Sequence, residues 1–124
     1  MSAVNIPGIN ADVGLDLYDG EMDIYMAILQ SFAENTPEAI DKLRNVTMDN
    51  LYAYGICVHG LKSVSASIGA LDFSAKAKLL ELMAKEGDLI GILAKNDELI
   101  REAQTLVDNI TTWLKTADVG TQDE

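Results

Sequence analysis

The chain contains a single histidine, His59, and a lysine three residues later, Lys62. On a helix, residues three apart are neighbours, so this spacing would place an imidazole beside an ammonium group. Neutral imidazole is a good nucleophile near neutral pH, and its phosphorylation creates a dianionic group. A lysine one turn away would offset that charge through a charge-assisted hydrogen bond. The pair therefore fits phosphoryl acceptance at His59, with Lys62 stabilising the product.

The segment from residue 51 to residue 70 predicts how a helix would present this pair. It contains none of the 20 acidic residues of the chain, so no carboxylate within it would repel a phosphoryl group. With about 100° of rotation per residue, His59 falls about 160° from Leu61 and is predicted to face solvent. The opposite side is the predicted buried stripe, made of Tyr54, Cys57, Val58, Leu61, Val64, Ser65 and Ile68.

The neighbours of His59 on the outward face form a partly apolar patch. Ser63 is small and leaves space beside the imidazole, while Tyr52, Ile56 and Ala66 stand where a solvated helix usually carries Glu and Lys. Apolar patches of this kind are typical of docking surfaces. The alternative is that an exposed histidine and an exposed lysine share this face by chance.

Other candidate sites are weaker. Cys57 precedes His59 by two residues, and side chains at that spacing point apart on a helix, so a nucleophilic Cys–His pair is not expected. A core position is usual for free cysteine. One His and one Cys cannot complete a tetrahedral zinc site, and neither a metal nor another cofactor is expected. The acidic residues between 16 and 23 lack calcium-loop spacing and are interpreted as charges that favour a helix start.

Composition restricts the class of protein. The 124 residues predict one domain, and a formal net charge of −11 argues against binding nucleic acid or an anionic membrane surface. The single cysteine fits a reducing compartment, and neither a signal peptide nor an apolar run of about 20 residues is evident. We expect a cytoplasmic protein without a membrane association.

Hydrophobic periodicity predicts an all-α fold. Between Gly20 and Leu114, apolar residues recur at helical spacing and no paired strand pattern occurs. Four long helices with short N-terminal helical pieces would form an up-and-down four-helix bundle. We expect residues 1–7 to be a flexible arm, residues 8–117 to form the bundle and residues 118–124 to be a polar tail.

Two positions are candidate interruptions of these helices. At Pro37 a helix either ends and restarts or kinks, and Thr36 as cap with Pro37 in the first turn favours a restart. Asn96 and Asp97 would divide the last helical segment into a short helix and a long one.

The residues around the histidine resemble a known motif. The run from His59 to Gly69, HGLKSVSASIG, is similar to H-x-L-K-G-x-[SA]-x-x-[LI]-G, the signature of histidine-containing phosphotransfer (HPt) domains. Weaker similarities to the family pattern flank this motif on both sides, in the correct order. The resemblance extends from Ile6 to Trp113 and covers most of the chain. Ser63 stands where the family usually has glycine. Serine is the next smallest polar residue, so access to His59 should survive.

The resemblance implies that His59 exchanges a phosphoryl group with the aspartate of a receiver domain, and that Lys62 stabilises the phosphohistidine. The implied partners are response-regulator receiver domains and a hybrid sensor histidine kinase, with Mg²⁺ on the receiver. The chain would be a monomeric phosphoryl carrier in a two-component phosphorelay and not an enzyme. It has no phosphate-cradling glycine loop and no Asp-Phe-Gly element. The alternative is a pseudo-HPt helical module that docks on partners without transferring phosphate.

Overall fold

The computed structural model describes residues 4–122 and the side chains of residues 4–117. This part of the chain contains five helices and no strand, so the prediction of an all-α fold is confirmed. The helices are α1 (Ala11–Asp16), α2 (Met22–Leu43), α3 (Leu51–Ala66), α4 (Leu71–Glu86) and α5 (Leu89–Gln122).

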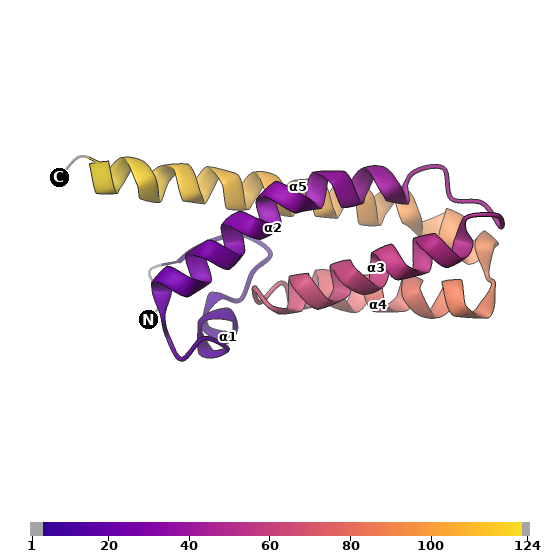
Figure 1. Cartoon of the computed structure of the whole chain (residues 1–124), viewed down its shortest axis with the longest axis horizontal. Coiled ribbons are helices and arrows are strands. Elements are labelled where there is room, and N and C mark those ends of the chain that lie inside the picture. Colours follow the sequence, from indigo (N-terminus) through magenta and orange to yellow (C-terminus); the bar gives the residue numbers. More distant parts are fainter. Residues whose placement is uncertain (1–3, 123–124) are drawn as a thin grey trace.

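The four long helices alternate in direction along the chain (Figure 1). α3 and α4 form a tight antiparallel hairpin, which lies beside the pair formed by α2 and α5. α2 also packs on α3, and α4 on α5, so each long helix has two neighbours. α5 is the longest, and its C-terminal part extends past the α3–α4 hairpin (Figure 1).

The core lies between these four helices, and the apolar stripe of each long helix contributes to it. Its fully buried side chains include Tyr25 and Leu29 of α2, Val58 of α3, Leu80 of α4 and Ile92 of α5. The helical spacing of the apolar residues therefore places one face of every long helix inside. Four polar or charged side chains are also buried among the described residues: Thr36, Ser65, Glu81 and Asn96.

Glycine allows the sharp turn that joins α3 to α4. Gly69 has a φ of +86°, and its carbonyl accepts a hydrogen bond of 2.9 Å from the backbone N–H of Asn10. A side chain at residue 69 would overlap the Asn10 carbonyl, so the segment before α1 lies directly against this turn. α4 ends at Gly87, which adopts a left-handed conformation with a φ of 73°.

Neither helix is divided into two at the predicted positions. α2 continues through Pro37, since the buried residues Thr36, Ile40 and Leu43 keep the segment after the proline on the core. α5 continues through Asn96, which lies in register with the buried Ile92, Leu99 and Ala103. The helix restart at residue 37 and the break at Asn96 and Asp97 were wrong, because core packing outweighs local preference at both places.

The two ends of the described chain contain buried and helical residues. Val4 and Ile6 are buried, although residues 1–7 were predicted to be a flexible arm. Helix α5 continues to Gln122, past residue 117, where the polar tail was placed. Residues 1–3 and 123–124 lie outside the described residues. Within the described part, no helix combines the length and apolarity that crossing a bilayer requires.

Candidate functional site

His59 lies on the outer face of α3, as the helical periodicity predicts. Its side chain is 58% exposed, whereas Val58 and Leu61 beside it are buried. Two members of the predicted buried stripe differ from expectation. Val64 is 45% exposed, so its assignment to the core was wrong, and Cys57 is half-buried. Both residues line a groove between α2 and α3 that a single-helix projection does not represent.

A carboxylate from the neighbouring helix joins His59 to Lys62. Glu81 of α4 has one oxygen, Oε2, at 2.6 Å from His59 Nδ1 and the other, Oε1, at 2.7 Å from Lys62 Nζ. The Glu81 side chain is only 6% exposed, and the Lys62 side chain is 27% exposed. The tight packing of the α3–α4 hairpin therefore places one carboxylate against two groups that are one turn apart on α3.

Lys85 brings a second cation to the same carboxylate. It follows Glu81 by one turn of α4, and its Nζ lies 3.5 Å from Glu81 Oε2, the oxygen that also contacts His59. Its side chain is largely exposed. The site therefore consists of one imidazole, two ammonium groups and one carboxylate.

These contacts determine the protonation state of Glu81. The hydrogen bond from Lys62 lowers the pKa of Glu81 to about 2, with His59 adding to the lowering and burial opposing it. An ionised carboxylate can only accept hydrogen bonds, so His59 donates its Nδ1–H to Glu81. In the neutral imidazole this leaves the lone pair on Nε2, the nitrogen remote from Glu81. Glu81 therefore selects the tautomer in which Nε2 is available as a nucleophile.

Sequence analysis missed Glu81 and Lys85 as members of the site. Glu81 lies four residues after Ala77 and eight after Phe73, both of which are buried, so it occupies a position of the apolar stripe of α4. A carboxylate at such a position needs a partner when it is buried, and this was the available signal. Its partners lie 19 and 22 residues earlier in the chain, beyond the reach of local spacing.

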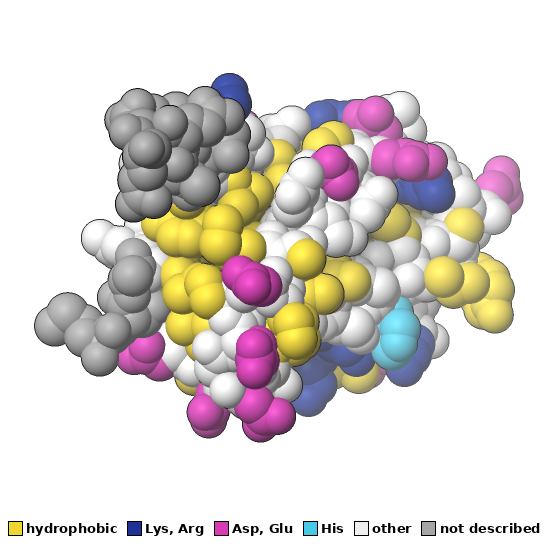
Figure 2. Space-filling model, turned by 60° about the vertical axis from the view of Figure 1, so that its left-hand side comes forward, with side chains coloured by type: hydrophobic (Ala, Val, Ile, Leu, Met, Phe, Trp, Pro, Cys, Tyr) yellow, Lys and Arg dark blue, Asp and Glu magenta, His cyan; other side chains and the backbone are white. Residues whose placement is uncertain are grey.

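The structure distributes the predicted docking residues along one face of α3. The Tyr52 and Ile56 side chains are 84% and 59% exposed, respectively. Ser63 is also exposed, and Ala66 is half-buried. No bulky group from the same face covers the imidazole, which Figure 2 shows at the molecular surface (cyan).

Two grooves flank α3 at this face, and Ile56 lines both of them. The groove between α3 and α4 has a volume of about 350 Å³ and contains His59, Glu81 and Lys85. The groove between α2 and α3 has a volume of about 560 Å³ and is mainly apolar. His59 therefore has charged groups of α4 on one side and an apolar groove on the other.

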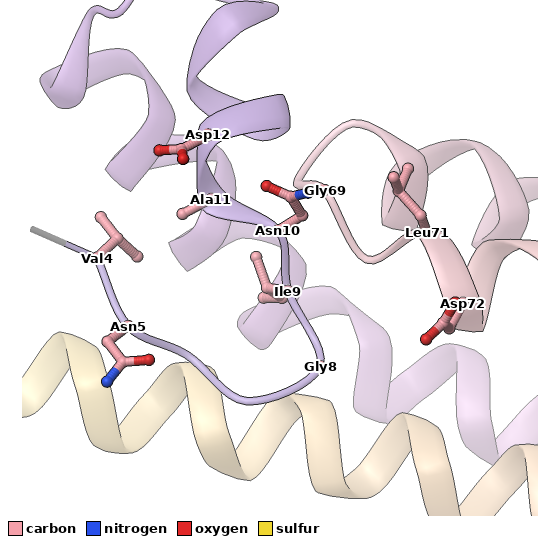
Figure 3. Close-up of a pocket in the computed structure, with 10 residues that line it drawn as sticks. All are labelled: Val4, Asn5, Gly8, Ile9, Asn10, Ala11, Asp12, Gly69, Leu71 and Asp72. Atoms are coloured by element: carbon pink, nitrogen blue, oxygen red, sulfur yellow. The ribbon is translucent and has the colours of Figure 1, made fainter. Parts of the chain in front are cut away.

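A larger cavity, of about 760 Å³, lies elsewhere, between the segment before α1 and the turn that joins α3 to α4 (Figure 3). Its polar lining comes mainly from Asn5, Asn10, Asp12 and Asp72. His59, Lys62, Glu81 and Lys85 are all absent from its lining. We therefore assign the candidate site to the outer face of α3 and the adjoining face of α4.

Among the described residues, no group of three His, Cys, Asp or Glu side chains is positioned to hold a metal ion. Compared with known proteins, the chain matches no family model, no curated protein and no solved structure.

Proposed function

We propose that this protein is a histidine phosphotransfer domain whose helices form an up-and-down four-helix bundle of the HPt type. His59 carries the phosphoryl group, and receiver domains of response regulators donate or accept it. The single observation that carries the proposal is the position of Glu81, which binds His59 Nδ1 and Lys62 Nζ with its two oxygens.

The transfer step uses the lone pair of His59 Nε2. That lone pair forms a P–N bond with the phosphorus of an aspartyl phosphate, while the P–O bond to the aspartate breaks and its electron pair leaves with the carboxylate. The Nδ1 proton stays in place, so the ring gains positive charge as the bond forms. Glu81 stabilises this charge from 2.6 Å, and transfer in the other direction reverses each change.

The role of Lys62 in this proposal is to bind the phosphoryl group. It lies one turn after His59 on α3, and its ammonium would bind the phosphoryl oxygens through charge-assisted hydrogen bonds. The receiver would supply the carboxylates and Mg²⁺ that complete the reaction centre. The chain is then a carrier that depends on its partner, and no ATP site of its own is required.

The exposed apolar groups around His59 suit this dependence on a partner. Tyr52 and Ile56 are exposed and line the same groove as His59, so a protein that covers this groove would also exclude water from the reacting nitrogen. We propose a monomer in the cytoplasm that receives its phosphoryl group through a hybrid sensor histidine kinase. The same exposed groups favour the second candidate, a pseudo-HPt module that docks without phosphotransfer.

The test is labelling by a phosphorylated receiver domain, or by a hybrid kinase that contains one. Transfer predicts an acid-labile, alkali-stable label that is absent from the His59→Gln variant, while receiver binding by that variant is largely retained. We expect Lys62→Ala to slow formation of the phosphohistidine or to shorten its lifetime. Label that persists in His59→Gln would exclude His59 as the acceptor. Binding without label across a broad panel of receivers would favour the docking module.

A further inference from the structure

The three contacts of Glu81 are unequal. Lys62 and the His59 Nδ1–H form hydrogen bonds to separate oxygens, whereas Lys85 Nζ lies at 3.5 Å and forms only an ion pair. Lys62 is mostly covered, and Lys85 is mostly exposed. The unphosphorylated site therefore contains one tightly bound cation and one loosely bound cation around the same buried carboxylate.

A phosphoryl group on His59 would compete with Glu81 for Lys62. It carries close to two negative charges and three strong acceptor oxygens, so it attracts the nearest ammonium group. Yet Glu81 is buried, and a buried carboxylate that loses its partner is strongly unfavourable. Lys62 can turn fully to the phosphoryl group only when another cation takes its place at Glu81.

We infer that Lys85 is this replacement: when His59 is phosphorylated, Lys62 turns to the phosphoryl group and Lys85 closes onto Glu81. The inference rests on the proposed function, because it assigns a role to Lys85 in the phosphorylated state of the same site. Lys85 is the only further cation on Glu81 among the described residues, and its exposed side chain is free to shorten the 3.5 Å separation. It is a positioning residue, because it acts on the phosphoryl group through Glu81 and Lys62.

The test is chemical phosphorylation of His59 with phosphoramidate, followed by a ³¹P NMR titration of the phosphoryl group against pH. In this labelling the Nε2 lone pair forms the P–N bond as ammonia leaves the phosphorus. A nearby cation favours the dianionic phosphoryl form and lowers the midpoint of the titration. Lys85→Met and Lys62→Met should each raise the midpoint by about 0.3 to 0.7 pH units, the scale of one partly exposed ion pair.

The deciding comparison uses a Glu81→Gln background. A neutral amide releases Lys62 without the need for a replacement, so adding Lys85→Met should leave the midpoint of Glu81→Gln unchanged. A shift of equal size in both backgrounds would mean that Lys85 contacts the phosphoryl group directly, and would overturn the exchange. The absence of a shift for Lys85→Met in the wild-type background would overturn it as well.

Two controls make the result specific. Lys85→Arg keeps the charge and should restore the wild-type midpoint. Lys78→Met removes an exposed lysine of the same helix that has no ion pair with the described residues, and it should leave the midpoint unchanged. Because phosphoramidate modifies an exposed imidazole without a protein partner, the titration stays readable even if no receiver transfers phosphate. Failure of the exchange and failure of the proposed function are therefore distinguishable.

Discussion

Glu81 determines what His59 can do, although it lies on a different helix. It accepts a hydrogen bond from Nδ1 and directs the lone pair to Nε2, and in the proposed transfer it would balance the charge that the ring gains. A Glu81→Gln variant keeps a carbonyl oxygen as acceptor but loses the negative charge. We expect phosphotransfer to His59 to slow by about 10- to 100-fold, with receiver affinity unchanged.

Single-turnover transfer from a phosphorylated receiver measures this rate, and a binding titration checks affinity. Glu86→Gln is the matched control, because Glu86 is an exposed carboxylate near the end of the same helix. An unchanged transfer rate in Glu81→Gln would remove Glu81 from the reaction and leave it a structural role.

The same carboxylate links stability to acid pH. Because the folded state lowers the pKa of Glu81 from 4.5 to about 2, chiefly through Lys62, ionised Glu81 stabilises the fold. This contribution is complete above pH 4.5 and is lost as the pH falls toward 2. Urea unfolding of wild type and Glu81→Gln from pH 6 to 2.5 should show the stability difference between them shrinking as the pH falls. A difference that is constant across this range would contradict the assigned ion pairing.

Residue-scale prediction from sequence succeeds where the relevant contact is local. His59 and Lys62 are one turn apart, so the periodicity of one helix is enough to place both on the same outer face. Glu81 comes from another helix, and its role depends on how α3 and α4 align in the hairpin. Spacing along the chain contains no information about that alignment.

At the scale of elements, the side chain of Asn96 in α5 forms hydrogen bonds to α2 and α3. Its Oδ1 accepts a hydrogen bond of 2.8 Å from the Tyr54 hydroxyl of α3, and its Nδ2 donates one of 2.8 Å to the Leu43 carbonyl at the end of α2. Asn96 is buried, and burial raises the pKa of Tyr54, which therefore stays a neutral donor. This network fixes the end of α2 and the start of α3 against the N-terminal part of α5.

Removing the Asn96 amide should strongly destabilise the fold, because the buried Tyr54 hydroxyl and Leu43 carbonyl then lack this hydrogen-bond partner. We expect Asn96→Ala to reduce the free energy of unfolding by about 2 to 4 kcal/mol and Tyr54→Phe by about 1 to 2 kcal/mol. Urea denaturation measures both values. Asn50→Ala removes an exposed amide instead, near the start of α3, and provides a comparison. A loss below 0.5 kcal/mol in Asn96→Ala, on the order of a surface substitution, would contradict the structural role of the network.

The elements also show why helix existence was predictable and helix continuity was not. Amphipathic spacing is a property of each segment, and it identifies all four long helices. Pro37 and Asn96 are poor helix formers locally, yet both lie among residues that are buried by other helices. Their tolerance within α2 and α5 is a tertiary effect that a local signal does not report.

For the molecule as a whole, charge is distributed unevenly. Residues 51–86 contain four lysines and three acidic residues, a formal charge of +1, so the rest of the chain carries −12. The α3–α4 hairpin, which presents His59, is therefore close to neutral within a strongly acidic protein. A partner that approaches with carboxylates around its own phosphoryl group meets less repulsion at this hairpin than elsewhere.

This charge distribution predicts that a new negative charge slows association with a receiver by an amount that depends on where the charge lies. Ala75 is an exposed residue of α4, and Gln104 is an exposed residue of α5. Ala75→Glu and Gln104→Glu each add one carboxylate, so the two variants have the same net charge. At low salt, we expect Ala75→Glu to slow association with a phosphorylated receiver by about two- to threefold, and Gln104→Glu to have a smaller effect. Stopped-flow association measured from about 0.02 to 0.5 M salt should show the difference disappearing as screening increases. Equal slowing by the two variants would mean that net charge alone governs the encounter, and that the polarity of the hairpin does not direct the partner to His59.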